Sequence, residues 1–336
     1  MATLEDVARQ AGVSISTVSR TINRPDMVND DTRTRVKAAI DDLGYQPNRV
    51  ARRLRRLDGR AHMLGLLIPD IQNPFYSDVV RGAEDVAYAR DAAVILCNTD
   101  ETSDREQFYV DVLKAESADG VILPPIARSD LNLDIKNIGM PLVFFDRRIS
   151  DASVDTVVVD NERGARDIVN HLIELGHRRI GLINGPETIA TSAERAAGYR
   201  RALHDQGIPF DDELVREGRP IRDAGKALTD ELLRLDHAPS ALFAANNQLA
   251  LGVLESVREH DLRIPEDIAV VTFDDAPWAK LLDPPLTTVR QPSYEMGRRA
   301  ADLLFDRIAS PDRAAALIVL QPELVVRASC GSQMDA

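Results

Sequence analysis

The sequence predicts a small all-α head followed by two α/β units, each built on a parallel β-sheet. In the first 45 residues, apolar side chains recur at helical spacing between turn residues. From residue 62 the pattern changes to short Val-, Ile- and Leu-rich runs that alternate with amphipathic stretches, and a second such series begins near residue 177. Buried parallel strands read as continuous apolar runs and need helical crossovers, so these patterns predict two doubly wound sheets.

Residues 3–23 are predicted to form two short helices joined by a tight turn. Thr3 stands at the expected N-cap of the first helix, with Asp6 three residues later. Gly12 interrupts the helical pattern, after which Ser14 can cap a second helix. The apolar residues that would pack the two helices together are Leu4, Val7, Ala8, Ala11, Val18 and Ile22.

The outward face of the second helix suits DNA. Small hydroxyl side chains can bind phosphate oxygens, Arg20 can donate two hydrogen bonds to guanine, and Ile15 can contact a thymine methyl. A helical pair with such a face is typical of the helix-turn-helix motif, whose second helix enters the major groove. The expected DNA contacts of this region are Thr3, Ser14, Ile15, Ser16, Thr17, Ser19, Arg20 and Asn23.

A third helix is expected from about Asp31, after a Pro-containing loop, and Gly44 ends it. An arginine-rich segment, RVARRLRRLDGR, then occupies residues 49–60. Charge runs are usually solvated, so one interpretation is a basic linker. The other is a helix that forms on DNA, because Ala51 and Leu54 contribute to an apolar edge among the arginines, and this pattern favours it.

The core strands follow from the apolar runs. In the first unit they are expected at residues 63–69, 92–98, 120–124, 141–146 and 155–160, with helices such as 74–89 and 105–116 between them. In the second unit they are expected at 177–185, 240–246, 268–275 and 286–292, with helices at about 162–175, 192–206, 222–235 and 247–260. Two such units in tandem place a cleft between them, lined by the carboxyl ends of strands.

Polar and aromatic residues stand at these predicted strand ends. Any one of them alone is better explained as a turn or cap residue. Together they suit a sugar-like ligand, because carboxylates, amides and arginine bind hydroxyls and an aromatic ring stacks on a sugar's apolar face. The candidates are Asp70, Asn73, Phe75, Asp146, Arg147, Asn246 and Asp274. Trp278 could add a stacking face, although a single Trp is more often a packing residue.

Several segments, in order along nearly the whole chain, resemble the LacI/GalR-type transcriptional regulators, the family of lactose, galactose and purine repressors. They are TLEDVARQAGVSISTVSRTIN, DDTRTRVKAAIDDLGYQPNRVARRL, DNERGARDIVNHLIELGHRRIGLINGP and DPPLTTVRQP. The resemblance implies a hinge helix at residues 48–55, with Leu54 wedged between base pairs in the minor groove. The hinge residues then expected on DNA are Asn48, Arg49, Ala51, Arg52, Leu54 and Arg55.

The resemblance also implies a periplasmic-binding-protein-like core, whose chain crosses between two subdomains three times, near residues 160, 290 and 320. The expected organisation is a helix-turn-helix domain at 1–47 and a hinge helix and linker at 48–60. The core N-subdomain is expected at 61–160 and 291–320, the C-subdomain at 161–290 and 321–330, and a tail at 331–336.

For the effector, the resemblance matches Arg195 to the arginine that binds effector hydroxyls, and Asn246 and Asp274 to further contacts. Phe75 matches an aromatic at the mouth of the cleft, and Thr191 and Ser192 fall on a segment that lines it.

The chain also departs from the family pattern at three positions. Purine-responsive members carry an arginine at the position of Ile189, several members place an aromatic at the position of Pro220, and Asn247 replaces a common aspartate. These departures argue against a purine and favour a sugar, polyol or sugar acid.

Charge is divided unevenly along the chain. Residues 1–60 hold twelve Lys and Arg against eight Asp and Glu, a net charge of +4, whereas the whole chain has a net charge of −13. A basic head on an acidic body implies that only the head meets nucleic acid. There is no apolar run long enough to cross a membrane and no secretion signal, and Cys97 and Cys330 lack metal-site spacing, so a cytoplasmic protein with reduced cysteines is expected.

These observations predict a homodimeric transcriptional regulator, expected to act as a repressor of carbohydrate-metabolism genes, that binds a near-palindromic DNA operator under control of a small-molecule effector. No heptad repeat follows Arg327, which favours a dimer over a tetramer. An enzyme is disfavoured because no nucleotide-binding or nucleophile motif occurs and the histidines lack ligand spacing; no cofactor or metal is expected. A nucleoside or partner-protein effector stays open, and a transport-type sugar-binding protein is a weaker alternative.

Overall fold

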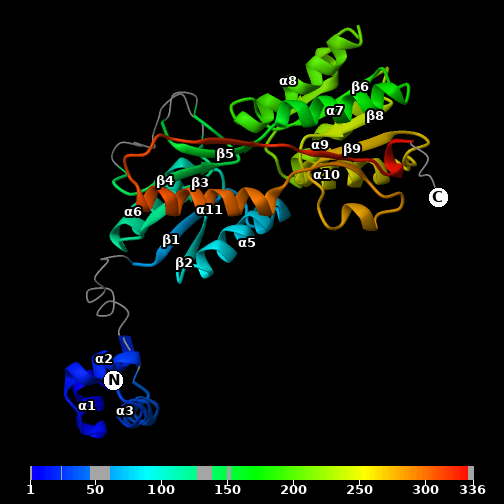
Figure 1. Cartoon of the computed structure of the whole chain (residues 1–336). Coiled ribbons are helices and arrows are strands. Elements are labelled where there is room, and N and C mark those ends of the chain that lie inside the picture. The colour runs from blue at the N-terminus through cyan, green and yellow to red at the C-terminus, as the bar shows by residue number, and fades with distance from the viewer. Residues whose placement is uncertain (1, 24, 46–60, 127–137, 150–152, 332–336) are drawn as a thin grey trace. The chain divides into compact units, whose positions relative to one another are not determined.

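The computed structural model describes residues 2–23, 25–45, 61–126, 138–149 and 153–331. The chain divides into two compact units, a head at residues 1–61 and a core at residues 62–336 (Figure 1). Within the described residues, no helix is long and apolar enough to cross a membrane.

The head is the three-helix unit that the sequence predicted. Its elements are α1 (Leu4–Ala11), α2 (Ile15–Asn23), the 3-10 turn η1 (Pro25–Met27) and α3 (Asp30–Leu43). At the start of α1, Asp6 N donates to Thr3 Oγ1 (3.2 Å) and Thr3 N donates to Asp6 Oδ2 (3.0 Å), which satisfies two backbone donors reciprocally. Gly12 takes a φ of +65° at the turn between α1 and α2. The buried core is Val7, Ala8, Ala11, Val18, Val36, Ala39 and Tyr45.

The core consists of two lobes, each with a six-stranded sheet. Lobe 1 has the strand order β11-β5-β4-β3-β1-β2, and all its pairs are parallel. The strands are β1 (Met63–Ile68), β2 (Ala93–Asn98), β3 (Gly120–Leu123), β4 (Leu142–Phe145), β5 (Asp155–Val159) and β11 (Leu317–Leu320). Its helices are α5 (Pro74–Tyr88), α6 (Ser103–Ala115) and α11 (Ser293–Ala309).

Lobe 2 has the strand order β12-β10-β9-β8-β6-β7, in which β10 and β12 are antiparallel and the other pairs parallel. The strands are β6 (Ile180–Asn184), β7 (Val215–Glu217), β8 (Ala241–Ala244), β9 (Ala269–Phe273), β10 (Thr287–Arg290) and β12 (Glu323–Val325). The helices are α7 (Asn161–Glu174), α8 (Ala190–Asp205), α9 (Arg222–Leu233) and α10 (Asn247–Glu259), with 3-10 turns η3 (Asp212–Leu214), η4 (Ala279–Leu281) and η5 (Ala328–Cys330).

The chain passes between the lobes after β5, after β10 and after β11, so both lobes are built from discontinuous segments (Figure 1). In lobe 1, α5 and α11 pack closely because each carries a glycine at the crossing. A Cβ on Gly82 would come within 2.0 Å of Tyr294 O, and one on Gly297 within 1.9 Å of Val79 O. The helix that enters lobe 1 after β10 is therefore held tightly against α5, next to the segment that connects the lobes.

Candidate functional site

A cleft of about 840 Å³ lies between the two lobes and is lined by residues from both. Strands of the two sheets end at this cleft, as expected for ligand sites in doubly wound folds. The structure brings together residues that the sequence analysis named separately, on strand ends and on helix α8. These lining residues are Asp70, Asn73, Phe75, Asp146, Arg147, Thr191, Ser192, Arg195, Asn246 and Asp274.

Trp278 is the exception among the sequence candidates. It does not line the cleft and instead packs against the hydrophobic core of lobe 2, just before η4. The structure thus does not place Trp278 at the cleft, because its partly buried indole packs on the other apolar residues of lobe 2.

Two aspartates occupy equivalent positions in the two lobes. Asp146 follows β4 with a φ of +62°, Asp274 follows β9 with a φ of +76°, and each is 5% exposed. Left-handed backbone is uncommon for residues other than glycine and gathers at functional sites. Tyr76 donates its hydroxyl to Asp146 Oδ2 (3.3 Å), and burial raises the pKa of Asp146 to about 6. Asp146 therefore loses its proton at a higher pH than an exposed aspartate does, around pH 6.

Asp274 is held from both lobe 2 and the connecting segment. Gln291 Nε2 donates to Asp274 Oδ1 (2.6 Å), and the backbone N of Asn247 donates to Asp274 Oδ2 (3.3 Å). These two bonds orient the carboxylate at the wall of the cleft. Gln291 was not among the sequence candidates, although it directly follows β10, as Asp146 follows β4 and Asp274 follows β9.

Arg147 does not stand free in the cleft. It is 5% exposed and forms a two-pronged pair with Glu101, in which Nη1 donates to Oε2 (2.8 Å) and Nη2 to Oε1. Its Nε lies 3.5 Å from Asp146 Oδ2 and makes no hydrogen bond with the described residues. Sequence reasoning missed Glu101, which lies in the turn before α6, because nothing in the local sequence indicates that its carboxylate pairs with an arginine after β4.

Arg195 is fixed by three partners in lobe 2. Its Nη1 donates to the carbonyl of Ala245 (2.6 Å), its Nε donates to Asn161 Oδ1 (3.0 Å), and its guanidinium carbon lies 3.9 Å from the ring centroid of Phe273. Its guanidinium therefore has a fixed orientation at the floor of the cleft. Thr191 and Ser192, in the first turn of α8, are also buried at the cleft wall.

The lobes touch directly at the N-termini of two helices. Asn73 caps α5 by accepting from Phe75 N (2.9 Å), and the same Oδ1 accepts from Asn247 Nδ2 (2.8 Å) in lobe 2. Asn246 caps α10 by accepting from Leu249 N (2.8 Å). Asn247, one of the three departures from the family pattern, thus bridges the lobes.

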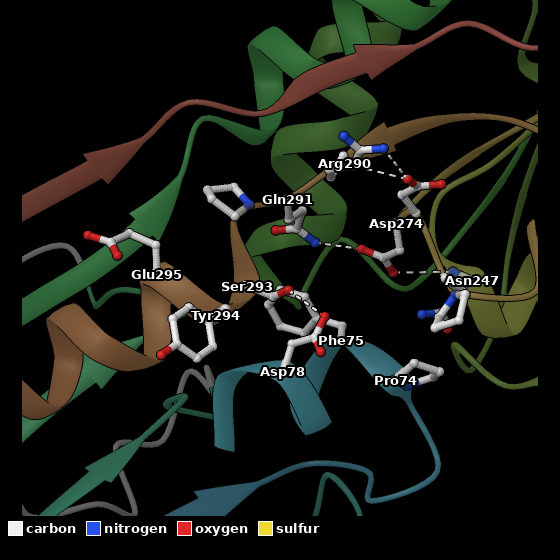
Figure 2. A pocket seen from close by; sticks show the side chains of 14 residues that line it. Pro74, Phe75, Asp78, Asn247, Asp274, Arg290, Gln291, Ser293, Tyr294 and Glu295 are labelled. Atoms are coloured by element: carbon white, nitrogen blue, oxygen red, sulfur yellow. Dashed lines mark hydrogen bonds and ion pairs between the residues drawn. The ribbon is translucent and has the colours of Figure 1, made fainter. Parts of the chain in front are cut away.

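A smaller cavity of about 410 Å³ adjoins the cleft where the chain passes from β10 to α11 (Figure 2). It shares Phe75, Asp274 and Gln291 with the cleft. Figure 2 shows Asp274 between Gln291 and Asn247, while Ser293 donates to Asp78 Oδ2 (3.1 Å) and ties α11 to α5. A movement of the Asp274 side chain would therefore disturb a hydrogen bond to Gln291, in a segment that connects the lobes.

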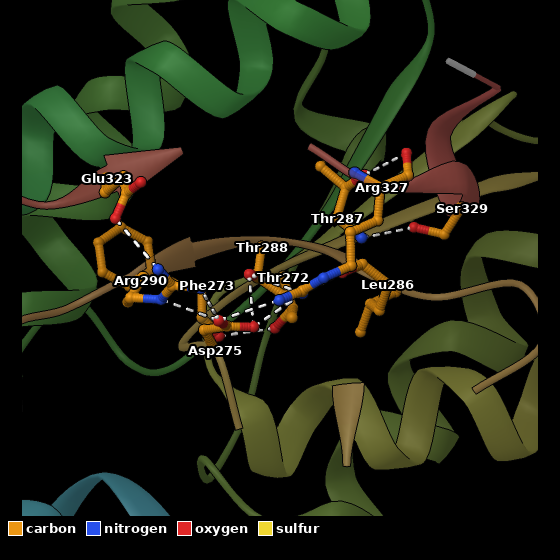
Figure 3. Close-up of polar contacts among 10 residues, drawn as sticks. All are labelled: Thr272, Phe273, Asp275, Leu286, Thr287, Thr288, Arg290, Glu323, Arg327 and Ser329. Carbon is orange, nitrogen blue, oxygen red and sulfur yellow. Dashed lines mark hydrogen bonds and ion pairs between the residues drawn. The ribbon is translucent and has the colours of Figure 1, made fainter. Parts of the chain in front are cut away.

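The neighbouring Asp275 organises a second polar cluster (Figure 3). Its Oδ1 lies 2.7 Å from Arg327 Nη1 and accepts from Thr288 Oγ1 (3.0 Å), and its Oδ2 lies 2.8 Å from Arg290 Nη2. Burial opposes ionisation, but the hydrogen bonds from Arg327 and Arg290 outweigh it and hold the pKa of Asp275 below its ordinary value. The cluster joins β10 to the segment after β12.

In the head, the face predicted to meet DNA is accessible. Ile15 is 44% exposed, and Ser14, Ser16 and Arg20 are exposed, while Thr17 and Ser19 are half-buried. Ser14 Oγ contacts Thr17 Oγ1 (2.8 Å), and Thr3 is engaged in the cap of α1. The predicted contacts Asn48, Arg49, Ala51, Arg52, Leu54 and Arg55 lie outside the described residues, as does the side chain of Asn23.

Comparison with known families gives two matches. Residues 3–48 match a family described as bacterial regulatory proteins, lacI family, and residues 169–330 match a periplasmic binding protein-like domain. The chain is 38% identical over 91% of its length to a probable transcriptional regulator, EndR, of Paenibacillus polymyxa, and covers 90% of that protein. It is 34% identical to the repressor PurR of Vibrio atlanticus, with 98% of both chains covered.

Solved structures show the same architecture. A transcriptional regulator CelR in complex with cellobiose is 36% identical, with a TM-score of 0.75 and with 98% of this chain and 100% of that chain covered. The lac repressor dimer bound to operator and the anti-inducer ONPF is 29% identical, with a TM-score of 0.85 and with 98% and 99% of the two chains covered.

Proposed function

Because this chain belongs to the LacI family of bacterial regulatory proteins and is a DNA-binding transcriptional regulator, we propose that a sugar-like effector in the interlobe cleft controls its binding to operator DNA. The effector class is a sugar, polyol or sugar acid, and the regulated genes serve carbohydrate metabolism. The observation that carries this proposal is the set of buried hydroxyl-binding groups, Asp146, Asp274 and Arg195, beside Phe75 in one cleft.

A nucleoside effector is the second candidate, because PurR of Vibrio atlanticus is similar over the full length of the chain. Two lining residues favour the sugar. Ile189 and Pro220 both line the cleft, at positions where the family resemblance implies an arginine in purine-responsive members and an aromatic in several members. Neither side chain can donate a hydrogen bond or stack as a flat ring, so a purine base would find fewer partners.

On the DNA side, the proposal is a homodimer in which each head reads one half of a near-palindromic operator through Ile15, Ser16 and Arg20. The hinge segment, residues 48–55, would open the minor groove between the half-sites. A ligand with unequal affinity for two arrangements of the lobes then changes the affinity for DNA.

The test is a thermal-shift screen of the full chain against sugars, polyols, sugar acids and nucleosides, since a ligand that binds only the folded state raises Tm. Each ligand found is then added to a titration of a symmetric DNA duplex at two salt concentrations. We expect a carbohydrate to raise Tm and to change the salt-sensitive affinity for DNA. A nucleoside as the sole effective ligand would overturn the carbohydrate assignment.

A further inference from the structure

The cleft is acidic in spite of its arginines. Among the described residues that line it, five are carboxylates and three are arginines. The carboxylates are Asp70, Asp100, Glu101, Asp146 and Asp274, and the arginines are Arg147, Arg195 and Arg219. A ligand that carries a carboxylate or a phosphate would therefore enter a field that repels it, unless one of the arginines pairs with it.

Arg219 is exposed, so a pair that it forms with a ligand is screened by water and contributes little, and the two buried arginines already have partners. Arg195 is engaged by neutral acceptors, Ala245 O and Asn161 Oδ1, and by the face of Phe273. Arg147, the other buried guanidinium, gives both of its terminal nitrogens to the two oxygens of Glu101. This is the geometry in which arginine would otherwise hold the carboxylate or phosphate of a ligand, so Glu101 occupies that place.

The backbone around Glu101 is held in an uncommon conformation. Asp100 and Glu101 take φ values of +50° and +56°, both left-handed. The adjacent Asn98 Nδ2 donates to Asp100 Oδ1 (2.5 Å), and Asp100 also pairs with Arg105. Two successive strained residues in the turn before α6 persist only where the surroundings fix them. The turn thus holds Glu101 next to Arg147, and it does so with two residues in an energetically unfavourable backbone conformation.

We propose that Glu101 is a specificity-determining residue of the effector cleft, which pairs with Arg147 so that the cleft takes neutral polyhydroxylated ligands and rejects those bearing a carboxylate or phosphate. The inference rests on the proposed carbohydrate effector and narrows it by excluding sugar acids and sugar phosphates. An anionic ligand that recruited Arg147 would leave the Glu101 carboxylate, whose side chain is only 27% exposed, without its partner, and this costs free energy. A neutral ligand leaves the pair intact.

The chain offers a matched control. Glu101→Gln removes one negative charge and weakens the hold on Arg147. Asp100→Asn removes one negative charge from the neighbouring residue, but its amide oxygen can still accept from Asn98 and it loses only an exposed pair with Arg105, so we expect the turn and the Glu101–Arg147 pair to stay in place. If the overall field alone excludes anions, the two variants behave alike. If the pairing of Arg147 excludes them, only Glu101→Gln gains affinity for anions.

The experiment is isothermal titration of the full chain, wild type and both variants, at pH 7.5 with three matched probe pairs. These are D-glucose and D-glucuronate, D-galactose and D-galacturonate, and D-ribose and D-ribose 5-phosphate. In at least one probe pair, we expect the wild type to bind the neutral member with at least about tenfold higher affinity than the anionic member. Loss of one hydrogen bond to a charged group changes an affinity by about this factor. Glu101→Gln reduces that ratio by about tenfold, and Asp100→Asn changes it by less than about threefold.

Three results overturn the inference. The first is a wild type that binds an anionic probe more tightly than its neutral counterpart. The second is a neutral-to-anionic affinity ratio that changes equally in both variants. Either result leaves the proposed carbohydrate effector unaffected. Failure of every probe, neutral and anionic, to bind a wild type that still binds duplex DNA overturns the carbohydrate effector itself, and the inference with it. Thermal unfolding of each variant checks that it is folded. If a variant does not fold, the affinities of the wild type for the neutral and anionic members of each probe pair still decide the question.

Discussion

At the scale of single residues, ionisation of Asp146 in the cleft destabilises the folded state. This carboxyl is buried, and its pKa is raised from 3.8 to about 6 by removal from water. A carboxyl whose pKa is higher in the folded state binds its proton more tightly there. Its contribution to stability is therefore complete below pH 4 and is lost as the pH rises through 6.

Asp146→Asn should make the protein more stable at pH 7.5. A shift of about two pKa units corresponds to about 3 kcal/mol, a penalty that the uncharged amide does not incur, and Asn tolerates the left-handed backbone at this position. Thermal unfolding from pH 4 to pH 8 measures the effect, and the difference from wild type should vanish near pH 4. An Asp146→Asn variant that is less stable than wild type at pH 7.5 would contradict a destabilising charge at this position.

The candidate residues that sequence reasoning found were those that follow strands, because the end of an apolar run is visible in the sequence. Asp146, Asn246 and Asp274 all belong to this class. Glu101 lies in the turn between β2 and α6, and its role depends on a pair with Arg147, 46 positions away, which no local pattern in the sequence indicates. Trp278 was misplaced because composition alone does not say whether a ring faces a cleft or a core.

At the scale of elements, the strands that were predicted are the ones that form apolar runs in the sequence, whether they are buried, as β3 is, or lie at an edge, as β2 does. β7 and β12 are three residues long and partly exposed, and β11 is an edge strand with Leu317 and Val319 exposed. β7 and β12 were missed because they are too short to form a recognisable run, whereas β11 lies in an apolar run, AAALIVL at residues 314–320, and nothing in the sequence explains its omission. α11 follows β10 and was also absent from the prediction, although its tight crossing with α5 positions the connection between lobes.

Asp275 contacts Thr288 and Arg290 on β10 and Arg327 after β12, so a substitution of Asp275 tests how much these contacts stabilise this edge of the lobe 2 sheet. Asp275→Asn removes the carboxylate that pairs with the largely buried Arg327, and we expect a loss of about 2–4 kcal/mol in the free energy of unfolding at pH 7. Because the pKa of Asp275 is lowered in the folded state, the wild type gains this stability above pH 4 and loses it as the pH falls through the folded pKa. Denaturant unfolding at pH 7 and at pH 3 should therefore show the variant's deficit shrinking in acid.

Glu323→Gln is the matched control for Asp275→Asn. Glu323 pairs with the same Arg290, 3.2 Å from its Nη1, but its side chain is 68% exposed. Exposed pairs contribute less than about 1 kcal/mol, so this variant should unfold almost like the wild type. If both variants lost the same free energy of unfolding, the burial of Asp275 would not strengthen its ion pairs.

At the scale of the whole molecule, the proposed control of operator binding by an effector requires that the two binding events be linked. By thermodynamic necessity, the factor by which effector changes the affinity for operator equals the factor by which operator changes the affinity for effector. Asp274 is placed to serve this linkage, because it lines the cleft and is bonded to Gln291 in the segment that connects the lobes.

Asp274→Ala should therefore abolish the effector response and leave DNA binding intact, since none of the predicted DNA contacts lies in the core. In the wild type, the two factors are measured by titrating operator with and without saturating effector, and effector with and without saturating operator. They should agree within error, whereas in Asp274→Ala both should approach one while the affinity for operator alone stays within about twofold of wild type. A normal effector response in this variant would remove Asp274 from the site, and a large loss of operator affinity without effector would show that Asp274 sets the resting arrangement of the lobes instead.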